Sequence, residues 1–129
     1  MTFKPKLAAL APYLRKARLQ LPSKMRFISA QYEAYLEGGL WRRNAENSNR
    51  EAKRLASLLK KIPGVELLCE PETNAIFARI PQPARERLGK EYFFYDWEEG
   101  LVRWMTSFDT TDEDVDRFAA ALRAAIGAK

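Results

Sequence analysis

The hydrophobic period of this chain changes at Pro63-Gly64, and this change constrains the fold more than any other feature. Before it, small and apolar residues recur at steps of four and three, the spacing of one helix face. They are Trp41, Ala45, Ser48, Ala52, Leu55, Leu59 and Ile62. After it, Val65 to Cys69 and Ala75 to Ile80 read as strands joined by a hairpin-sized connection. The chain is therefore expected to be an α+β protein.

Two more helices are expected before the one that runs from Trp41 to Ile62. Pro5 suits a first helical turn, whereas Pro12 is expected to kink the first helix or restart it before Leu14 to Leu21. A second helix is expected to begin near Ser23 and to end at Gly38-Gly39. Its apolar stripe is Met25, Ile28, Tyr32, Tyr35 and Leu36.

The second half of the chain predicts a short helix, a second strand pair and a last helix. The short helix follows Pro81 and ends near Gly89, and the strands are Tyr92 to Trp97 and Leu101 to Thr106. Thr110-x-x-Glu113 has the spacing of a capping box that starts the last helix.

These elements predict two parts, residues 1–39 with the first two helices and residues 40–129 with the rest. The expected architecture is three N-terminal helices followed by an antiparallel sheet of about four strands, covered on one face by helices.

One arginine stands inside the apolar strand that ends at Thr106. Alternation places Leu101, Arg103 and Met105 on one face and Val102 and Trp104 on the other. A guanidinium pairs bidentately with a carboxylate, so Arg103 is a candidate for gripping an amino-acid substrate. The structural alternative is that its stem packs on the sheet while its head reaches water.

The sequence has no histidine and one cysteine. Without histidine, Ser-His-Asp, Cys-His and HExxH sites are excluded within these residues, and neither a catalytic residue nor a metal site is assigned. Cys69 alternates with Leu67 in a predicted strand, so a buried free thiol is expected; a nucleophile would need a lowered pKa. A chain that cannot form an internal disulfide fits a reducing compartment, and the cytoplasm is the expected location.

Charge is uneven along the chain. The net charge is +5, and no acidic residue precedes Glu33. A basic surface could bind nucleic acid, but RNP, KH and zinc-finger patterns are absent, so solvated helix faces are expected instead. The segment Leu7 to Leu14 is interrupted by Pro12 and is too short to span a membrane, so no membrane partner is expected.

Aromatic residues gather around the second strand pair. They are Tyr92, Phe93, Phe94, Tyr95, Trp97 and Trp104. One interpretation is a surface on which the bases of a nucleic acid stack. Core packing is favoured, because alternation places about half of these rings on the buried face of a sheet.

Several segments occur in an order that resembles the C-terminal part of the L-threonine aldolases, pyridoxal-phosphate enzymes of fold type I. They are residues 20–27, 40–45, 63–68, 74–79 and 102–116, and the most specific are 20–44 and 102–115. The resemblance implies the small C-terminal α+β domain of that fold, in an enzyme that cleaves β-hydroxy amino acids to glycine and an aldehyde.

The resemblance also implies roles for particular residues. An arginine at the position of Arg103 holds the substrate carboxylate, and Lys24 or Arg26 would approach anionic groups of the cofactor. The large domain with the Schiff-base lysine precedes the part that matches Thr2, so this chain alone is expected to bind no pyridoxal phosphate and to be inactive, as a truncated product or fragment.

Two residues of the helix from Trp41 to Ile62 depart from the family pattern. Aldolases often have histidine at Asn47 and commonly methionine at Glu51. Either change could be surface drift or could mark a chain no longer selected for catalysis.

The exposed apolar helix faces predict two kinds of partner, a second copy of this chain or a different protein. Without a large domain the long helices would expose apolar seams, so self-association as a homodimer is expected. The alternative function is a non-catalytic module that docks on a pyridoxal-phosphate enzyme or another partner through the seam from Trp41 to Ile62.

Overall fold

The computed structural model describes residues 4–18, 22–98 and 100–127. The chain forms two compact units, Met1–Leu40 and Trp41–Lys129. Each unit is considered by itself. None of the described helices is long and apolar enough to cross a membrane.

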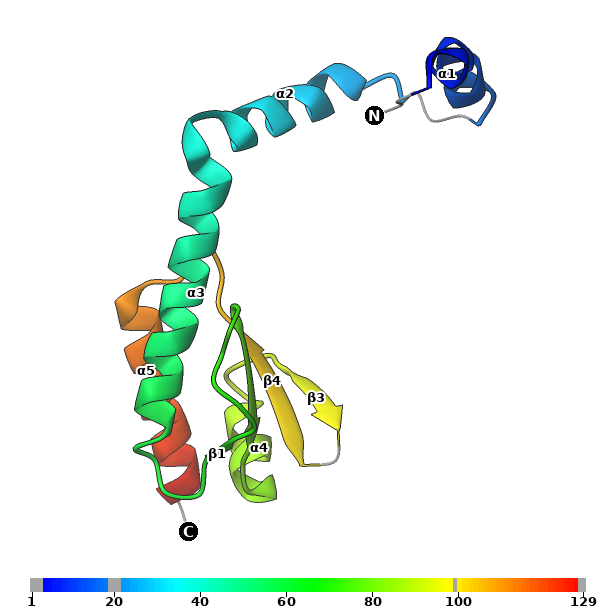
Figure 1. Cartoon of the computed structure of the whole chain (residues 1–129). Helices are drawn as coiled ribbons and strands as arrows, with labels where there is room; N and C mark the ends of the chain where they lie inside the picture. Colours follow the sequence, from blue (N-terminus) through cyan, green and yellow to red (C-terminus); the bar gives the residue numbers. More distant parts are fainter. Residues whose placement is uncertain (1–3, 19–21, 99, 128–129) are drawn as a thin grey trace. The chain divides into compact units, whose positions relative to one another are not determined.

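The first unit consists of helices (Figure 1). They are α1 (Pro5–Ala17), α2 (Met25–Leu36) and the single 3₁₀ turn η1 (Glu37–Gly39). The predicted end of α2 is confirmed, because Gly38 and Gly39 both have positive φ, at 60° and 73°, which side chains with a Cβ rarely adopt. No residue of α2 is buried, and its predicted apolar stripe is therefore largely exposed.

The expected restart at Pro12 is wrong. Pro12 lies inside α1, which continues as one helix to Ala17. Proline removes only one backbone donor, and α1 is solvent-exposed around Pro12, so water can solvate the carbonyl that loses its partner. The last part of the predicted restarted helix, residues 19–21, lies outside the described residues.

The second unit alternates helices and strands. Its elements are α3 (Leu40–Leu59, beginning one residue before the unit), β1 (Glu66–Leu67), β2 (Ala75–Arg79), α4 (Gln82–Leu88), β3 (Tyr95–Glu98), β4 (Leu101–Met105) and α5 (Asp112–Gly127). The predicted α+β class and the antiparallel sheet are confirmed, with strand order β1-β2-β4-β3.

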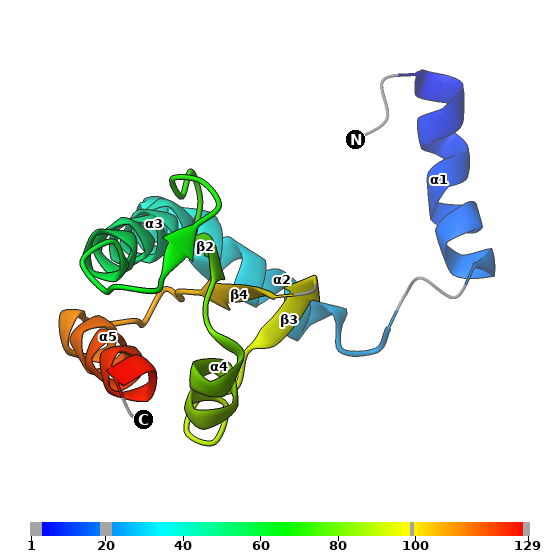
Figure 2. The same ribbon diagram turned by 90° about the horizontal axis from the view of Figure 1, so that it is seen from below.

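Helices α3, α4 and α5 cover one face of the sheet. Figures 1 and 2 both place α3 beside α5, and two ion pairs join them, from Arg54 to Asp112 and Asp116. The core between this helical layer and the sheet includes Ile76 and Val102 from the strands. Its helical members include Ala52, Leu55, Leu59, Ala84, Leu88, Val115, Ala119, Leu122 and Ala125.

We call the other side of the sheet the open face. It carries Phe77, Arg103 and Met105, because alternate residues of a strand point to opposite sides. Met105 is 57% exposed there, whereas its neighbour Trp104, on the helical side, is 5% exposed. The predicted division of β4 into two faces is thus confirmed at these residues.

Two strand predictions extend too far. β1 has only two residues, so Cys69 lies beyond its end and is exposed, which makes the expected buried thiol wrong. β3 begins at Tyr95 rather than at Tyr92. Strand propensity does not show where cross-strand pairing stops, and a residue without a cross-strand partner is not part of the strand.

Candidate functional site

Arg103 lies at the centre of the open face. In the sheet register it is opposite Phe77 of β2 on one side and opposite Tyr95 of β3 on the other. Directly opposite residues of antiparallel strands have neighbouring side chains on the same face. The register therefore surrounds the arginine with aromatic rings from both adjacent strands.

The contacts of the guanidinium are made with two rings of β3. Its carbon Cζ lies 4.6 Å from the centroid of the Trp97 ring and 5.5 Å from that of Tyr95. Both distances are within the range of cation–π attraction. Edge-to-face contacts extend the cluster, since Phe77 packs on Trp97 at 5.4 Å and Phe93 on Tyr95 at 5.1 Å. We call these five side chains the arginine row.

The side-chain polar atoms of Arg103 have no hydrogen-bond partner among the described residues. Its Nε is buried and has no hydrogen-bond partner. The two Nη atoms are not buried, and no ion pair of Arg103 occurs in the part of the chain that the structure describes. A guanidinium in this state can still accept an anionic partner through its Nη edge.

The end of β4 is fixed to its neighbours by hydrogen bonds. The buried hydroxyl of Thr106 donates to the carbonyl of Ser48 in α3 at 2.7 Å. The backbone of Thr106 also exchanges bonds with Asn74: its N–H donates to the Asn74 carbonyl at 3.0 Å, and the Asn74 side-chain amide donates to its carbonyl at 2.8 Å. The strand that carries Arg103 is thus anchored three residues further on.

Asn47 holds the loop that follows β4. Its side-chain amide donates to the carbonyls of Phe108 and Thr110, both at 3.0 Å, while its Oδ1 accepts a 2.6 Å bond from Arg50. Arg50 in turn pairs with Glu51 at 2.8 Å. The two residues that depart from the family pattern therefore belong to one hydrogen-bonded network.

Glu51 is the unexpected member of the core. It is 0% exposed, its Oε1 accepts from Arg50, and its Oε2 has no partner. The sequence pattern gave no signal of this burial, because Glu51 stands beside the predicted seam of α3 rather than on it.

The capping box of α5 lies one residue later than predicted. The Thr111 hydroxyl accepts from the Asp114 N–H at 3.2 Å, and Asp114 accepts from the Thr111 N–H at 3.1 Å and from its hydroxyl at 2.8 Å. The hydroxyl of Thr110 instead accepts from the Ser107 N–H at 2.8 Å. The bonds from Thr111 hold the pKa of Asp114 below its ordinary value, and Arg117 lowers it further.

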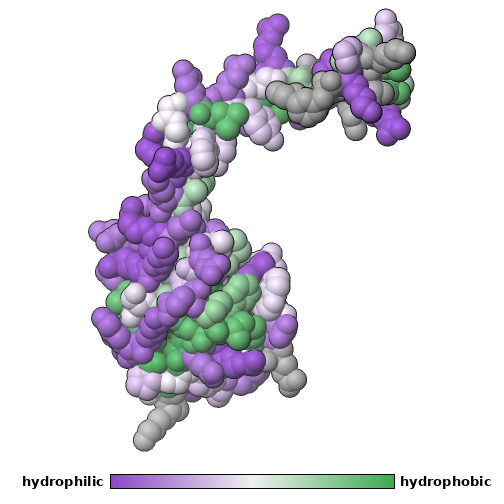
Figure 3. Space-filling model, viewed as in Figure 1, coloured by the Kyte–Doolittle hydropathy of each residue, from purple (hydrophilic) through white to green (hydrophobic). Residues whose placement is uncertain are grey.

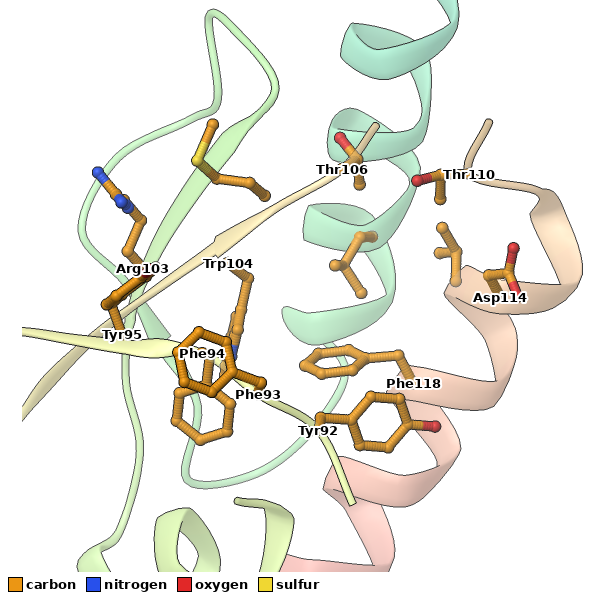
Figure 4. A pocket seen from close by; sticks show the side chains of 13 residues that line it. Tyr92, Phe93, Phe94, Tyr95, Arg103, Trp104, Thr106, Thr110, Asp114 and Phe118 are labelled. Carbon is orange, nitrogen blue, oxygen red and sulfur yellow. The ribbon is translucent and has the colours of Figure 1, made fainter. Parts of the chain in front are cut away.

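A pocket of about 310 Å³ lies where β3 leaves the edge of β4. Its wall is mainly aromatic, and Phe94, Trp104, Phe118 and Tyr92 form successive edge-to-face contacts along it. Figure 4 shows that the side chains of Arg103 and Trp104 leave β4 in opposite directions. Arg103 also lines this pocket, so its side chain borders both the pocket and the open face.

Neither of the two pockets described offers the lysine that a pyridoxal-phosphate enzyme uses. The internal aldimine requires a lysine, yet no lysine lines this pocket or the second one, between α4 and Asp96. The lysines whose side chains are described are all exposed.

The predicted cofactor contacts lie in the other unit. Lys24 precedes α2 and Arg26 lies in its first turn, and both are exposed. Their role stays a prediction. The aromatic prediction is met in part: Trp104 is buried and Tyr92 and Phe94 are half-buried, whereas Phe93, Tyr95 and Trp97 are exposed.

The chain is similar to known aldolases over nearly its whole length, although no family model matches it. It is 42% identical over 128 residues to the low specificity L-threonine aldolase of Pseudomonas sp. (strain NCIMB 10558), and 38% identical to that of Pseudomonas aeruginosa. Each alignment covers 98% of this chain but 37% of the relative. The chain thus spans little more than a third of the length of these relatives.

Two solved structures share the fold. Glycine decarboxylase (P-protein) of the glycine cleavage system matches 74% of this chain and 24% of its own, with a TM-score of 0.64 and 24% identity. Leishmania major threonine aldolase matches 75% of this chain and 30% of its own, with a TM-score of 0.61 and 22% identity. The fold is the predicted one, the small C-terminal domain of fold-type I enzymes.

Proposed function

Because this chain is a homologue of the C-terminal part of the L-threonine aldolases, we propose that it supplies the substrate-carboxylate site of a pyridoxal-phosphate-dependent lyase. The reaction of the complete enzyme is the cleavage of a β-hydroxy amino acid to glycine and an aldehyde. The observation that carries this proposal is the placement of Arg103, which lies on the open face with no acidic partner among the described residues.

Arg103 has the properties that a carboxylate clamp requires. It lies on a strand anchored through Thr106, so its backbone position is fixed by the sheet and by α3. Its unpaired Nη atoms offer parallel N–H donors, the geometry that matches two carboxylate oxygens. A structural arginine would be expected to pair with a carboxylate of its own chain or to extend into water, and this one instead lies over the rings of Trp97 and Tyr95.

The cofactor belongs to a part of the enzyme that the matched region does not supply. When bound, pyridoxal phosphate provides the electron sink for carbon–carbon cleavage. This chain contributes binding and orientation of the substrate carboxylate, and by itself it is inactive. Lys24 or Arg26 would approach the anionic groups of the cofactor in the complete enzyme.

Exposed apolar side chains support self-association, for which we propose a homodimer. In the first unit Leu10, Tyr13, Phe27 and Tyr32 are each more than half exposed, and Figure 3 shows hydrophobic residues at the surface of this unit. Sedimentation velocity should give a dimer at micromolar concentrations. A compact monomer at high concentration would refute this part of the proposal.

A chimera tests the proposed function directly. The matched 128 residues of the Pseudomonas sp. aldolase are replaced by this chain, and threonine cleavage is measured with pyridoxal phosphate. The chimera should be active, and Arg103→Lys should raise KM for threonine because lysine keeps the charge but loses the planar fork. Arg123→Lys, an exposed change on α5, is the matched control.

The outcomes separate folding from function. Cofactor absorbance reports whether the chimera has assembled. A chimera that binds the cofactor but does not cleave threonine, or one in which Arg103→Lys behaves like Arg123→Lys, would refute the proposed role of this chain.

A further inference from the structure

We propose that Trp97 and Tyr95 are positioning residues that hold the Arg103 guanidinium so that it receives a carboxylate end-on, through Nη1 and Nη2. The inference rests on the proposed function, which assigns the carboxylate to Arg103, and it adds how the chain prepares that side chain.

The arginine row places two aromatic rings beside the Arg103 guanidinium. Arg103 and both rings come from adjacent strands, with Tyr95 directly opposite Arg103 in the register. The guanidinium carbon lies 4.6 Å from the Trp97 centroid, closer than to Tyr95. Trp97 is itself braced by the edge of Phe77, and Tyr95 by Phe93. The rings therefore form a support that exists before any ligand binds.

The buried Nε of Arg103 limits how a carboxylate can approach the guanidinium. A carboxylate can grip a guanidinium from the side, through Nε and one Nη, or from the end, through both Nη atoms. Nε of Arg103 is buried and has no partner, so the side approach is closed. The Nη edge is not buried and is the only edge left to an anion.

The exposure of the rings argues against an ordinary packing role. Trp97 is 50% exposed and Tyr95 is 57% exposed, so neither ring closes the helical core. Stacking lowers the rotamer entropy that a free arginine side chain would lose on binding, and it does not neutralise the charge. The row thus orders the cation and leaves its charge available.

Nuclear magnetic resonance of the full chain tests both the ring contacts of Arg103 and its binding of a carboxylate. The Nε–H of Arg103 should resonate upfield, because it lies near ring faces, and should exchange slowly with water, because it is buried. Sodium acetate should shift the Arg103 signals, whereas sodium chloride at equal ionic strength should not.

Three variants distinguish positioning from general packing. Trp97→Leu should abolish the upfield shift, speed the exchange and weaken acetate binding by about two- to tenfold, the cost of ordering one arginine side chain that the ring no longer holds. Trp97→Phe keeps a ring and should restore most of the affinity. Trp41→Leu is the matched control, since Trp41 is 47% exposed and lies outside the row.

Each result bears on the inference. Equal acetate affinity in Trp97→Leu and the wild type would overturn it, as would a wild-type Arg103 that does not respond to acetate. Its failure differs from failure of the proposed function. If Arg103→Lys raises KM in the chimera while Trp97→Leu does not, the positioning role is wrong and the carboxylate role stands.

Discussion

Replacing Glu51 by methionine is expected to stabilise the second unit. Glu51 is fully buried on α3, and only one of its two carboxylate oxygens has a partner. Methionine has a similar length, bears no charge and is flexible enough to fill the same space. The change therefore removes a buried carboxylate without leaving a large cavity.

The size of the effect follows from the environment of the two partners. A buried polar atom without a hydrogen bond costs about 1–3 kcal/mol. The Arg50 side chain is 64% exposed, so breaking its pair with Glu51 returns it to water and costs about 0–1 kcal/mol. The net expectation is a gain of about 1–2 kcal/mol, and each kcal/mol raises Tm by about 4–8 °C in a unit of this size.

Thermal and urea unfolding of the full chain, followed by circular dichroism, measure the gain. A double-mutant cycle with Arg50→Ala separates the ion pair from the burial. Arg50→Ala should destabilise the wild type, because it leaves the Glu51 carboxylate buried and unpaired, and should be nearly neutral in the Glu51→Met background.

A loss of stability in Glu51→Met, with an unchanged urea m-value, would refute this reasoning. It would mean that the free oxygen of Glu51 is satisfied in solution and that the carboxylate contributes net stability.

The capping box and the β4–α5 loop give two further tests. Because bonds from Thr111 lower the folded-state pKa of Asp114, this carboxylate stabilises the fold above its ordinary pKa and loses that effect as pH falls through the lowered value. The Tm difference between the wild type and Asp114→Asn should therefore be full at pH 7 and should vanish in strong acid, and a difference independent of pH would contradict the assignment. Asn47→Ala removes the hydrogen bonds to the Phe108 and Thr110 carbonyls and should lower the free energy of unfolding by about 1–2 kcal/mol. Hydrogen exchange should show faster amide exchange in residues 107–110 than in the control Asn49→Ala. Equal exchange in the two variants would count against the role of Asn47.

The sequence predicted those elements whose signal is local. The seam of α3 was readable from its period, and Ala52, Leu55 and Leu59 are buried as that period requires. The alternation of β4 likewise placed Trp104 on the core side and Arg103 on the other. Period and alternation depend on backbone geometry alone, so they can be read without knowledge of what packs against them.

The errors concern residues whose state depends on a distant partner. The cap of α5 shifted from Thr110 to Thr111: both threonines offer the same side chain, and Asn47, 63 residues away, holds the carbonyl of Thr110. Cys69 lost its predicted strand because β2 pairs with only two residues of β1. Neither choice is encoded within a few residues of the position itself.

For the candidate site, the sequence by itself determined that an arginine would interrupt an apolar strand, and the family resemblance predicted a carboxylate partner for it. Only the tertiary structure decided what surrounds that arginine. The rings of Tyr95 and Trp97 come from another strand, and the register of β3 on β4 brings them to the guanidinium. Register is a property of paired strands rather than of one, because it is set by the whole ladder and by the layer that packs behind it.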